Sequence, residues 1–354
     1  MAKDAVNVLL GKPMNDRSQQ RRQLLGLQAT RGLAALMVVC FHATMTLGKP
    51  EYLSYRPLGN FFAFGHAGVD FFFVLSGFII GYVHGADLGR PDRLGRYGRR
   101  RFTRIYPIYW LITAGVAAFA LFAGDAGMLT TATLLESLTL ISFGSFPLVP
   151  PAWTLEHEVL FYGAFGLAIW HRGMAKFLVA LCLLLVAAGG CFPTSPWPLL
   201  YLGSPYHLQF LMGIAAALVI AHHDVRHPLL IAAAGASLFA MTAVLDVAGR
   251  IPEEPVSVSL YGIGSVLAII GIAAAERSGV ISCGRAAETF GAMSFSLYLT
   301  NLYAVGLTTR ICARLGLLGA VPDWLIMSWQ VVAALIVALG VHLLLEKPLM
   351  RLFR

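Results

Sequence analysis

The sequence is short of charge. Charged residues make up 12% of its 354 residues and hydrophobic residues 58%, whereas a soluble domain carries about 25% charged residues. So few charged groups cannot cover the surface of a soluble protein of this size. The composition therefore excludes a water-soluble enzyme and an intrinsically disordered chain, and it indicates an integral membrane protein with helical spans.

Cysteine is also scarce, and its placement excludes a secreted disulfide scaffold. The five cysteines are scattered through apolar segments, and none forms a C-x-x-C pair. Apolar packing explains them best. The histidine-rich segment 222–227 has the composition of a metal site but lies in a short exposed loop. We therefore predict no metal site.

Long hydrophobic stretches are abundant. A helix that crosses the hydrocarbon core needs about 20 mostly apolar residues. Ten such stretches run over residues 27–47, 61–84, 103–123, 152–170, 174–191, 205–222, 228–248, 256–275, 287–308 and 324–345. The fold class is therefore all-α, a polytopic membrane protein of about ten transmembrane helices. Whether the shorter, broken run 129–143 enters the membrane is left open.

The basic residues predict the orientation. With the N-terminus in the cytoplasm, 20 Lys and Arg residues fall on cytoplasmic segments and five on outer loops, as the positive-inside rule requires. Both termini are therefore predicted to be cytoplasmic, and the net charge of +8 reflects topology, not nucleic-acid binding. We expect a basic N-terminal tail (1–26), one transmembrane domain (27–348) and a short C-terminal tail (349–354), with no appended soluble domain.

The first predicted span carries two ionisable residues, Arg31 and His42. Their spacing of eleven residues places them on one helix face, about 16 Å apart along the axis. Arg31 alone could anchor the helix at the interface, and His42 alone could bond a neighbouring helix. The shared face favours a functional path, because charged groups deep in a bilayer are costly.

The second and fourth predicted spans carry buried acids. Asp70 lies among phenylalanines and needs a partner, for which His42 is a candidate. Glu156 and Glu158 follow a double proline at the start of the fourth span. Glu156 there complements the helix dipole, whereas Glu158 lies deeper. In the last span, His342 and Glu346 are four residues apart and can face each other. Glu346 is predicted to pair, and the arginines of the segment 84–104 are also candidate partners.

Seven arginines and no lysine occupy the segment 84–104 between the second and third spans. Guanidinium groups match phosphate bidentately, and Arg101 and Arg104 lie three residues apart on one helix face. Phosphate binding and plain positive-inside topology explain this segment equally well.

Together these residues resemble the membrane-bound acyltransferase-3 family, and most closely its exopolysaccharide acetyltransferases, which O-acylate extracytoplasmic sugars. The resemblance covers nearly the whole chain. Its motifs are Arg31-x10-His42, the 68–78 run GVDFFFVLSGF, the 100–107 run RRFTRIYP, W-T-L-x-x-E from Trp153 to Glu158, the 294–300 run SFSLYLT, and E-K-P at 346–348.

One position departs from the family pattern. The family often has histidine after the LYLT run, where this chain has Asn301. An amide can still donate and accept hydrogen bonds. We therefore keep Asn301, with Trp153, as a predicted acceptor-binding residue.

The resemblance implies an O-acyltransferase with cytoplasmic acyl-CoA, most simply acetyl-CoA, as co-substrate and no permanently bound cofactor. The implied donor-binding residues are Arg31, Arg100, Arg101, Arg104 and Tyr106. A sugar hydroxyl needs a general base to attack a thioester.

His42 is the predicted base or acyl carrier, oriented by Asp70 or Glu158. The implied partners are acyl-CoA, a polysaccharide or glycolipid acceptor and the lipids of a bacterial inner membrane.

Buried Arg, His, Asp and Glu would also suit a proton-coupled transporter or flippase of a polysaccharide precursor, although the sequence shows no internal repeat of the kind such carriers use. The sugar, the acyl chain and the oligomeric state, including a homo-oligomer, are left open.

Overall fold

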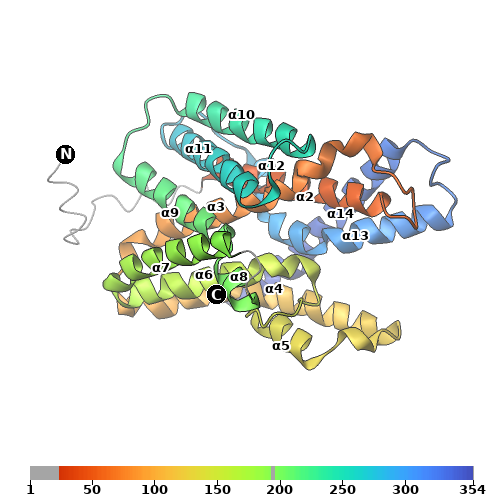
Figure 1. Cartoon of the computed structure of the whole chain (residues 1–354), viewed down its shortest axis with the longest axis horizontal. Helices are drawn as coiled ribbons and strands as arrows, with labels where there is room; N and C mark the ends of the chain where they lie inside the picture. Colours follow the sequence, from red (N-terminus) through yellow and green to blue (C-terminus); the bar gives the residue numbers. More distant parts are fainter. Residues whose placement is uncertain (1–23, 193–195, 354) are drawn as a thin grey trace.

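The computed structural model describes residues 24–192 and 196–353, and in these ranges the secondary structure is helical, with no strand. Residues 1–23 of the predicted N-terminal tail lie outside the described residues. The long helices lie side by side roughly along the long axis of the molecule (Figure 1). The chain is thus an all-α polytopic membrane protein, as its composition predicts.

Each predicted span lies largely on helix. The principal elements are α2 (Leu25–Leu47), η2 (Pro57–Ala67), α3 (Gly68–His84), α4 (Leu94–Phe122), α5 (Thr131–Thr139), η6 (Pro150–Ala152), α6 (Trp153–Trp170), α7 (Arg172–Cys191), α8 (Trp197–Leu202), α9 (Tyr206–His222), α10 (Pro228–Val247), η7 (Glu253–Ser257), α11 (Val258–Arg277), α12 (Arg285–Ala292), α13 (Ser294–Arg314), α14 (Asp323–Val341), η8 (His342–Glu346) and α15 (Lys347–Leu352). Short 3-10 turns, η3 (Gly85–Asp87), η4 (Pro91–Arg93) and η5 (Ala126–Met128), link some of them.

Among the described residues, eight helical segments are long and apolar enough to cross a membrane. The predicted spans at α6 and α13 fall outside this set. Both carry polar groups that lower their hydropathy, such as Glu156 and Glu158 in α6 and Arg310 in α13. The number of ten spans and the cytoplasmic position of both termini stay predictions.

Three boundaries differ from the sequence prediction. Helix α4 begins at Leu94, so most of the arginine-rich segment is helical and not loop. The predicted span 287–308 is two helices, α12 and α13, which meet at Met293. Helix α5 has nine residues, about 14 Å at 1.5 Å per residue, which is too short to span a bilayer.

Helices α3 and α9 pack with their backbones in contact. A Cβ atom on Gly77 would lie 2.1 Å from the carbonyl oxygen of Phe210, and one on Gly213 would lie 2.0 Å from that of Val74. Only glycine fits at both positions, as in the small-residue interfaces of membrane helices. This contact fixes the rotation of α3 and therefore the direction in which its polar residues point.

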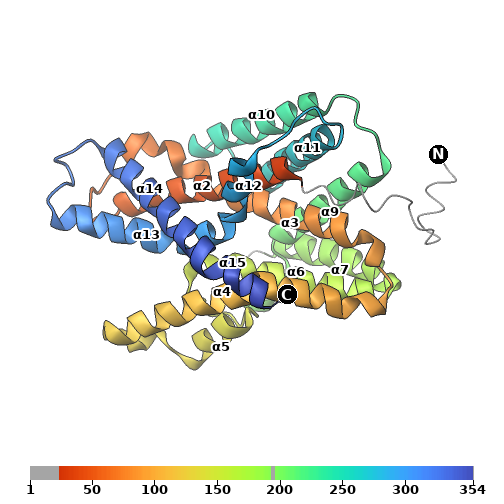
Figure 2. The ribbon, with the colours of Figure 1, turned by 180° about the vertical axis from the view of Figure 1, so that it is seen from behind.

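Helices from both ends of the sequence meet at the centre of the molecule. The first helix, α2, packs against α12, α13 and α14 as well as α3. Figure 2 shows α15 crossing the beginning of α4 near the C-terminus. Residues far apart in the sequence therefore line the same interior space.

Candidate active site

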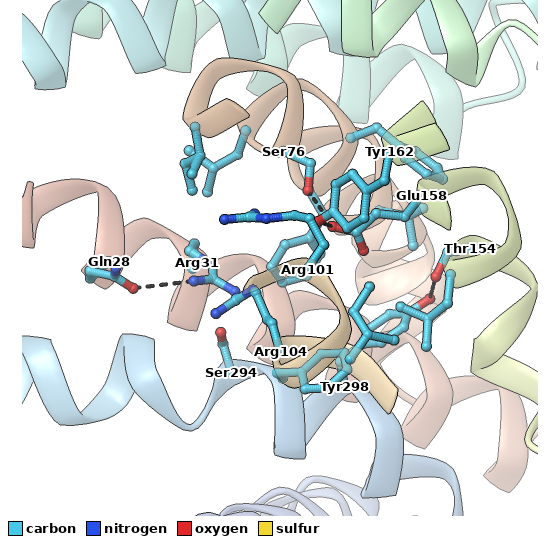
Figure 3. Close-up of a pocket in the computed structure, with 18 residues that line it drawn as sticks. Gln28, Arg31, Ser76, Arg101, Arg104, Thr154, Glu158, Tyr162, Ser294 and Tyr298 are labelled. Carbon is cyan, nitrogen blue, oxygen red and sulfur yellow. Dashed lines mark hydrogen bonds between the residues drawn. The ribbon is translucent and has the colours of Figure 1, made fainter. Parts of the chain in front are cut away.

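A cavity of about 170 Å³ lies where α2, α3, α4, α6 and α13 converge. Its polar lining comes from all five helices: Gln28, Arg31, Ser76, Arg101, Arg104, Thr154, Glu158, Tyr162, Ser294 and Tyr298 (Figure 3). Phenylalanine, leucine, isoleucine and valine side chains complete the wall. A few directed polar groups in an apolar cavity are typical of a small-molecule site.

Three guanidinium groups point into this cavity, those of Arg31, Arg101 and Arg104 (Figure 3). Arg31 donates to Gln28 Oε1 over 3.3 Å, and the Arg101 guanidinium lies 5.5 Å from the centre of the Tyr162 ring. Within the described ranges, none of the three makes a salt bridge within 4.0 Å to a carboxylate. The three side chains are half-buried, and one carboxyl group, that of Glu158, is among the lining residues. The lining therefore carries an excess of positive charge, which suits an anionic ligand.

Glu158 faces the arginines from α6. Its Oε1 accepts hydrogen bonds from Ser76 Oγ, 2.9 Å away, and from the hydroxyl of Tyr162. These bonds hold the carboxylate at the cavity wall, where its charge acts on Arg31. Glu158 therefore lowers the net positive charge of the cavity and offers a second acceptor oxygen to a ligand.

The imidazole of His42 pairs with Asn301. His42 Nδ1 lies 2.5 Å from Asn301 Oδ1, while Asn301 Nδ2 donates to the carbonyl oxygen of Tyr298 over 2.6 Å. A carbonyl oxygen only accepts, so the network assigns the amide nitrogen to Tyr298 and the amide oxygen to His42. His42 Nδ1 must then carry the proton, which leaves the lone pair on Nε2.

Tyr298 connects this pair to the arginine cavity. Its side chain lines the cavity and its hydroxyl lies 2.9 Å from Thr154 Oγ1, whereas its carbonyl accepts the amide of Asn301. His42 and Asn301 are not part of the cavity lining. The ring of Phe72, 5.8 Å from the Tyr298 ring, lines the same wall. One turn of α13 therefore links the two parts of the site.

Asp70, for which His42 was a candidate partner, is hydrogen-bonded to Gln209. Asp70 is buried, at 2% exposure, and its Oδ1 accepts Gln209 Nε2 over 2.7 Å. Gln209 also donates to the carbonyl of Val258. The close α3–α9 contact turns the Asp70 side of α3 toward α9 and α11. The side-chain hydrogen bond of His42 in the described ranges is to Asn301, and the orienting role of Asp70 or Glu158 stays a prediction.

Three other predicted site residues lie beside the cavity and not in its lining. Arg100 is exposed. Tyr106 donates to the carbonyl of Thr139 over 2.8 Å. Trp153 packs its ring 6.4 Å from that of Phe73. The donor-binding role of Arg100 and Tyr106 and the acceptor-binding role of Trp153 stay predictions.

Sequence reasoning missed the polar neighbours of the charged groups. Gln28 was a detectable one, because it stands three residues before Arg31 on the same helix face. Tyr162 stands four residues after Glu158 on the same helix, a spacing that brings two side chains together. Ser76 and Tyr298 come from other helices, so no local spacing could have found them.

In the last membrane helix, His342 and Glu346 face each other, as their spacing allows. His342 Nδ1 lies 2.8 Å from Glu346 Oε2, which also accepts Ser296 Oγ over 2.6 Å. This acid therefore has partners on its own helix and on α13. In the described ranges no group of three or more His, Cys, Asp or Glu side chains could hold a metal ion.

Comparison with known proteins supports one family. Residues 24–347 match the acyltransferase-3 family, described as an acyltransferase domain. The chain is 28% identical to the exopolysaccharide production protein ExoZ of Rhizobium meliloti, over 83% of this chain and 92% of the relative. It is 25% identical to the acyltransferase MdmB of Streptomyces mycarofaciens, over 93% and 92%.

A third relative is more distant. The peptidoglycan O-acetyltransferase OatA of Listeria monocytogenes is 25% identical over 42% of this chain and 21% of its own length. No solved structure matches this chain.

Proposed function

This chain belongs to the acyltransferase-3 family, and from that membership we propose that it transfers an acyl group, most simply acetyl, from cytoplasmic acyl-CoA to a hydroxyl of an extracytoplasmic or lipid-linked polysaccharide sugar. The names of the relatives ExoZ and OatA support a polysaccharide acceptor. The proposed location is a bacterial inner membrane.

The observation that carries the proposal is the convergence of Arg31, Arg101 and Arg104 in one cavity without a salt-bridged carboxylate among the described residues. CoA carries several phosphate charges, and guanidinium groups bind phosphate bidentately. Helix α4 begins in the segment that topology places on the cytoplasmic side. A donor that enters from the cytoplasm would meet these arginines first.

The acyl end of the donor would then extend toward His42, which shares a helix face with Arg31. Asn301 Oδ1 accepts the hydrogen bond of His42 Nδ1–H. Nε2 of His42 therefore carries the free lone pair and is the basic atom. General bases contribute about 10²- to 10⁴-fold to rate. Asn301 is thus a positioning residue in this proposal, and Tyr298 holds its amide in place.

Two routes use the same atoms. In the direct route, Nε2 takes the proton of the sugar hydroxyl while its oxygen attacks the thioester carbonyl. The C–S bond then breaks, and the departing CoA thiolate receives that proton. In the covalent route, Nε2 itself attacks the thioester, CoA leaves, and the sugar hydroxyl then displaces the acyl group from the imidazole.

Purified protein, labelled acetyl-CoA and polysaccharide acceptor test the proposal. Wild-type protein should move label to the glycan, and His42→Ala should not, although it inserts and purifies normally. His222→Ala is the matched control, because His222 is exposed. Full transfer by His42→Ala would overturn the role of His42. A transporter or flippase would instead move a precursor without consuming acetyl-CoA.

A further inference from the structure

A second cavity, of about 300 Å³, lies against the other face of α6. We name it the outer cavity, because predicted topology places the ends of α5, α6 and α8 that border it on the extracytoplasmic side. Its main lining residues are Ser142, Trp153, Glu156, His157, Trp197 and Tyr201. The mechanism above uses none of them.

The first two turns of α6 separate the two cavities. Thr154 and Glu158 line the arginine cavity, whereas Trp153, Glu156 and His157 line the outer cavity. Successive residues of a helix point about 100° apart around its axis. Thr154 and Glu158 therefore point to one side of α6, and Trp153, Glu156 and His157 point to the other. The two spaces therefore lie back to back across one helix.

Glu156 is a buried acid that lines the outer cavity. Its side chain is buried, at 4% exposure, and its Oε1 has no hydrogen-bond partner among the described residues. Buried polar atoms are nearly always hydrogen-bonded, and an exception needs an explanation. A carboxyl oxygen without a protein partner can accept a hydrogen bond from an O–H or N–H group of a ligand.

His157 offers a second acceptor. His207 Nδ1 lies 3.1 Å from the carbonyl oxygen of Leu202 and must donate to it, because a carbonyl only accepts. With both rings neutral, His207 Nε2 then accepts the proton of His157 Nδ1, 3.0 Å away. This relay leaves the lone pair of His157 on Nε2.

Aromatic rings form the rest of the binding surface. Trp197 is 40% exposed and donates through Nε1 to Ser142 Oγ over 3.2 Å. Tyr201 stacks on His157 with ring centres 4.6 Å apart. Flat apolar rings beside hydrogen-bond acceptors match a sugar, which has an apolar C–H face and hydroxyl donors at its edge.

We propose that the outer cavity binds one neutral sugar unit of the acceptor glycan, away from the hydroxyl that is acylated. The rings of Trp153, Trp197 and Tyr201 contact its C–H face, and Glu156 and His157 accept its hydroxyl protons. The nearby carboxylate of Glu136 disfavours an acidic sugar. This inference rests on the proposed function. Binding of a sugar unit in the outer cavity would supply binding energy away from the reacting hydroxyl and so position a long acceptor.

The test compares acceptors of different length. The probes are a methyl hexoside and oligosaccharides of increasing length released from the surface polysaccharide of the host cell. Trp197→Ala and Glu156→Leu should raise KM for long oligosaccharides at least tenfold, because each removes a proposed sugar contact. Both should leave unchanged the KM for acetyl-CoA and the rate of transfer to the methyl hexoside. Trp197→Phe should restore most of the loss.

Trp324→Ala is the matched control, because Trp324 is an exposed tryptophan at the start of α14, outside the outer cavity. Long oligosaccharides should also change the tryptophan fluorescence of wild-type protein, without acetyl-CoA, and change that of Trp197→Phe less. Size exclusion and acetyl-CoA binding show that each variant is folded.

Equal KM values for long acceptors in wild type, Trp197→Ala and Glu156→Leu would overturn the proposal. So would a fluorescence change that Ca²⁺ alone produces and EDTA abolishes, because the acids would then bind a cation. If wild-type protein consumes no acetyl-CoA, the proposed function fails. The fluorescence titration still tests the outer cavity in that case, since it needs no acyl transfer.

Discussion

His42 Nδ1 lies 2.5 Å from Asn301 Oδ1, and this bond joins two residues that are 259 positions apart. It defines which nitrogen of the imidazole is basic, because an amide oxygen can only accept. The structure gives Asn301 a contact with the proposed base, and its acceptor-binding role stays a prediction. The pair therefore provides the most direct test of the mechanism.

Replacing Asn301 with leucine should lower kcat by about tenfold or more, because an unoriented His42 loses part of the 10²- to 10⁴-fold effect of a general base. The KM for acetyl-CoA should not change, since Asn301 lies outside the arginine cavity. Steady-state transfer assays check both values. Asn301→Asp should keep more activity than Asn301→Leu, because it preserves the acceptor oxygen, and equal losses would argue against the orienting role.

Replacing His42 with alanine should reduce acyl transfer by about 10²- to 10⁴-fold, with unchanged acetyl-CoA binding. A single-turnover experiment without acceptor separates the two routes. Early release of CoA with label retained on wild-type protein indicates the covalent route, and its absence indicates direct transfer. Label retained on His42→Ala would show that another residue carries the acyl group.

Replacing Arg101 or Arg104 with glutamine should weaken the binding of acetyl-CoA, because each change removes one guanidinium from the cavity. Rising salt should weaken wild-type binding in the same direction, although less steeply than for exposed charges. Titration calorimetry in detergent measures both effects. Arg99→Gln is the control, since Arg99 is exposed on the same helix. Unchanged affinity in Arg101→Gln and Arg104→Gln would leave these arginines a purely topological role.

Replacing Gly77 with alanine should destabilise the protein by about 1–3 kcal/mol, the usual cost of forcing extra atoms into a packed interior. The new Cβ would lie 2.1 Å from the Phe210 carbonyl oxygen, so α3 and α9 would have to separate. Thermal unfolding in detergent measures the change. Gly85→Ala adds the same atom where no other atom lies within 4 Å and should have little effect; equal shifts would refute the close-contact explanation.

The positions of the helices were predictable because hydrophobic length alone marks a membrane helix. Each predicted span lies largely on helix, and the largest boundary error concerns α4. Helix α4 begins at Leu94, because the arginine-rich residues before the predicted span are also helical. Hydropathy marks only the apolar part of a helix and does not detect this polar extension. The break at Met293 was missed because residues 287–308 are mostly uncharged, and hydropathy does not show where one helix ends and the next begins.

The partners of the buried charges were only partly predictable. Local spacing was enough for His342 and Glu346, which face each other within one helix. It was not enough for Asp70, whose partner Gln209 depends on how α3 is rotated against α9. That rotation is fixed by backbone contact at Gly77 and Gly213, and no single-helix pattern specifies which helix a small-residue face will meet.

The contact between α2 and α13 also sets an order of events during synthesis. At about 5–20 residues per second, the ribosome needs roughly 13–50 s to pass from His42 to Asn301, positions that are 259 apart. The first membrane helix therefore enters the bilayer long before its imidazole has a partner. A chain that ends between α2 and α13 carries the proposed base but not the residue proposed to orient it, so the pair is complete only when about five-sixths of the 354 residues have been made.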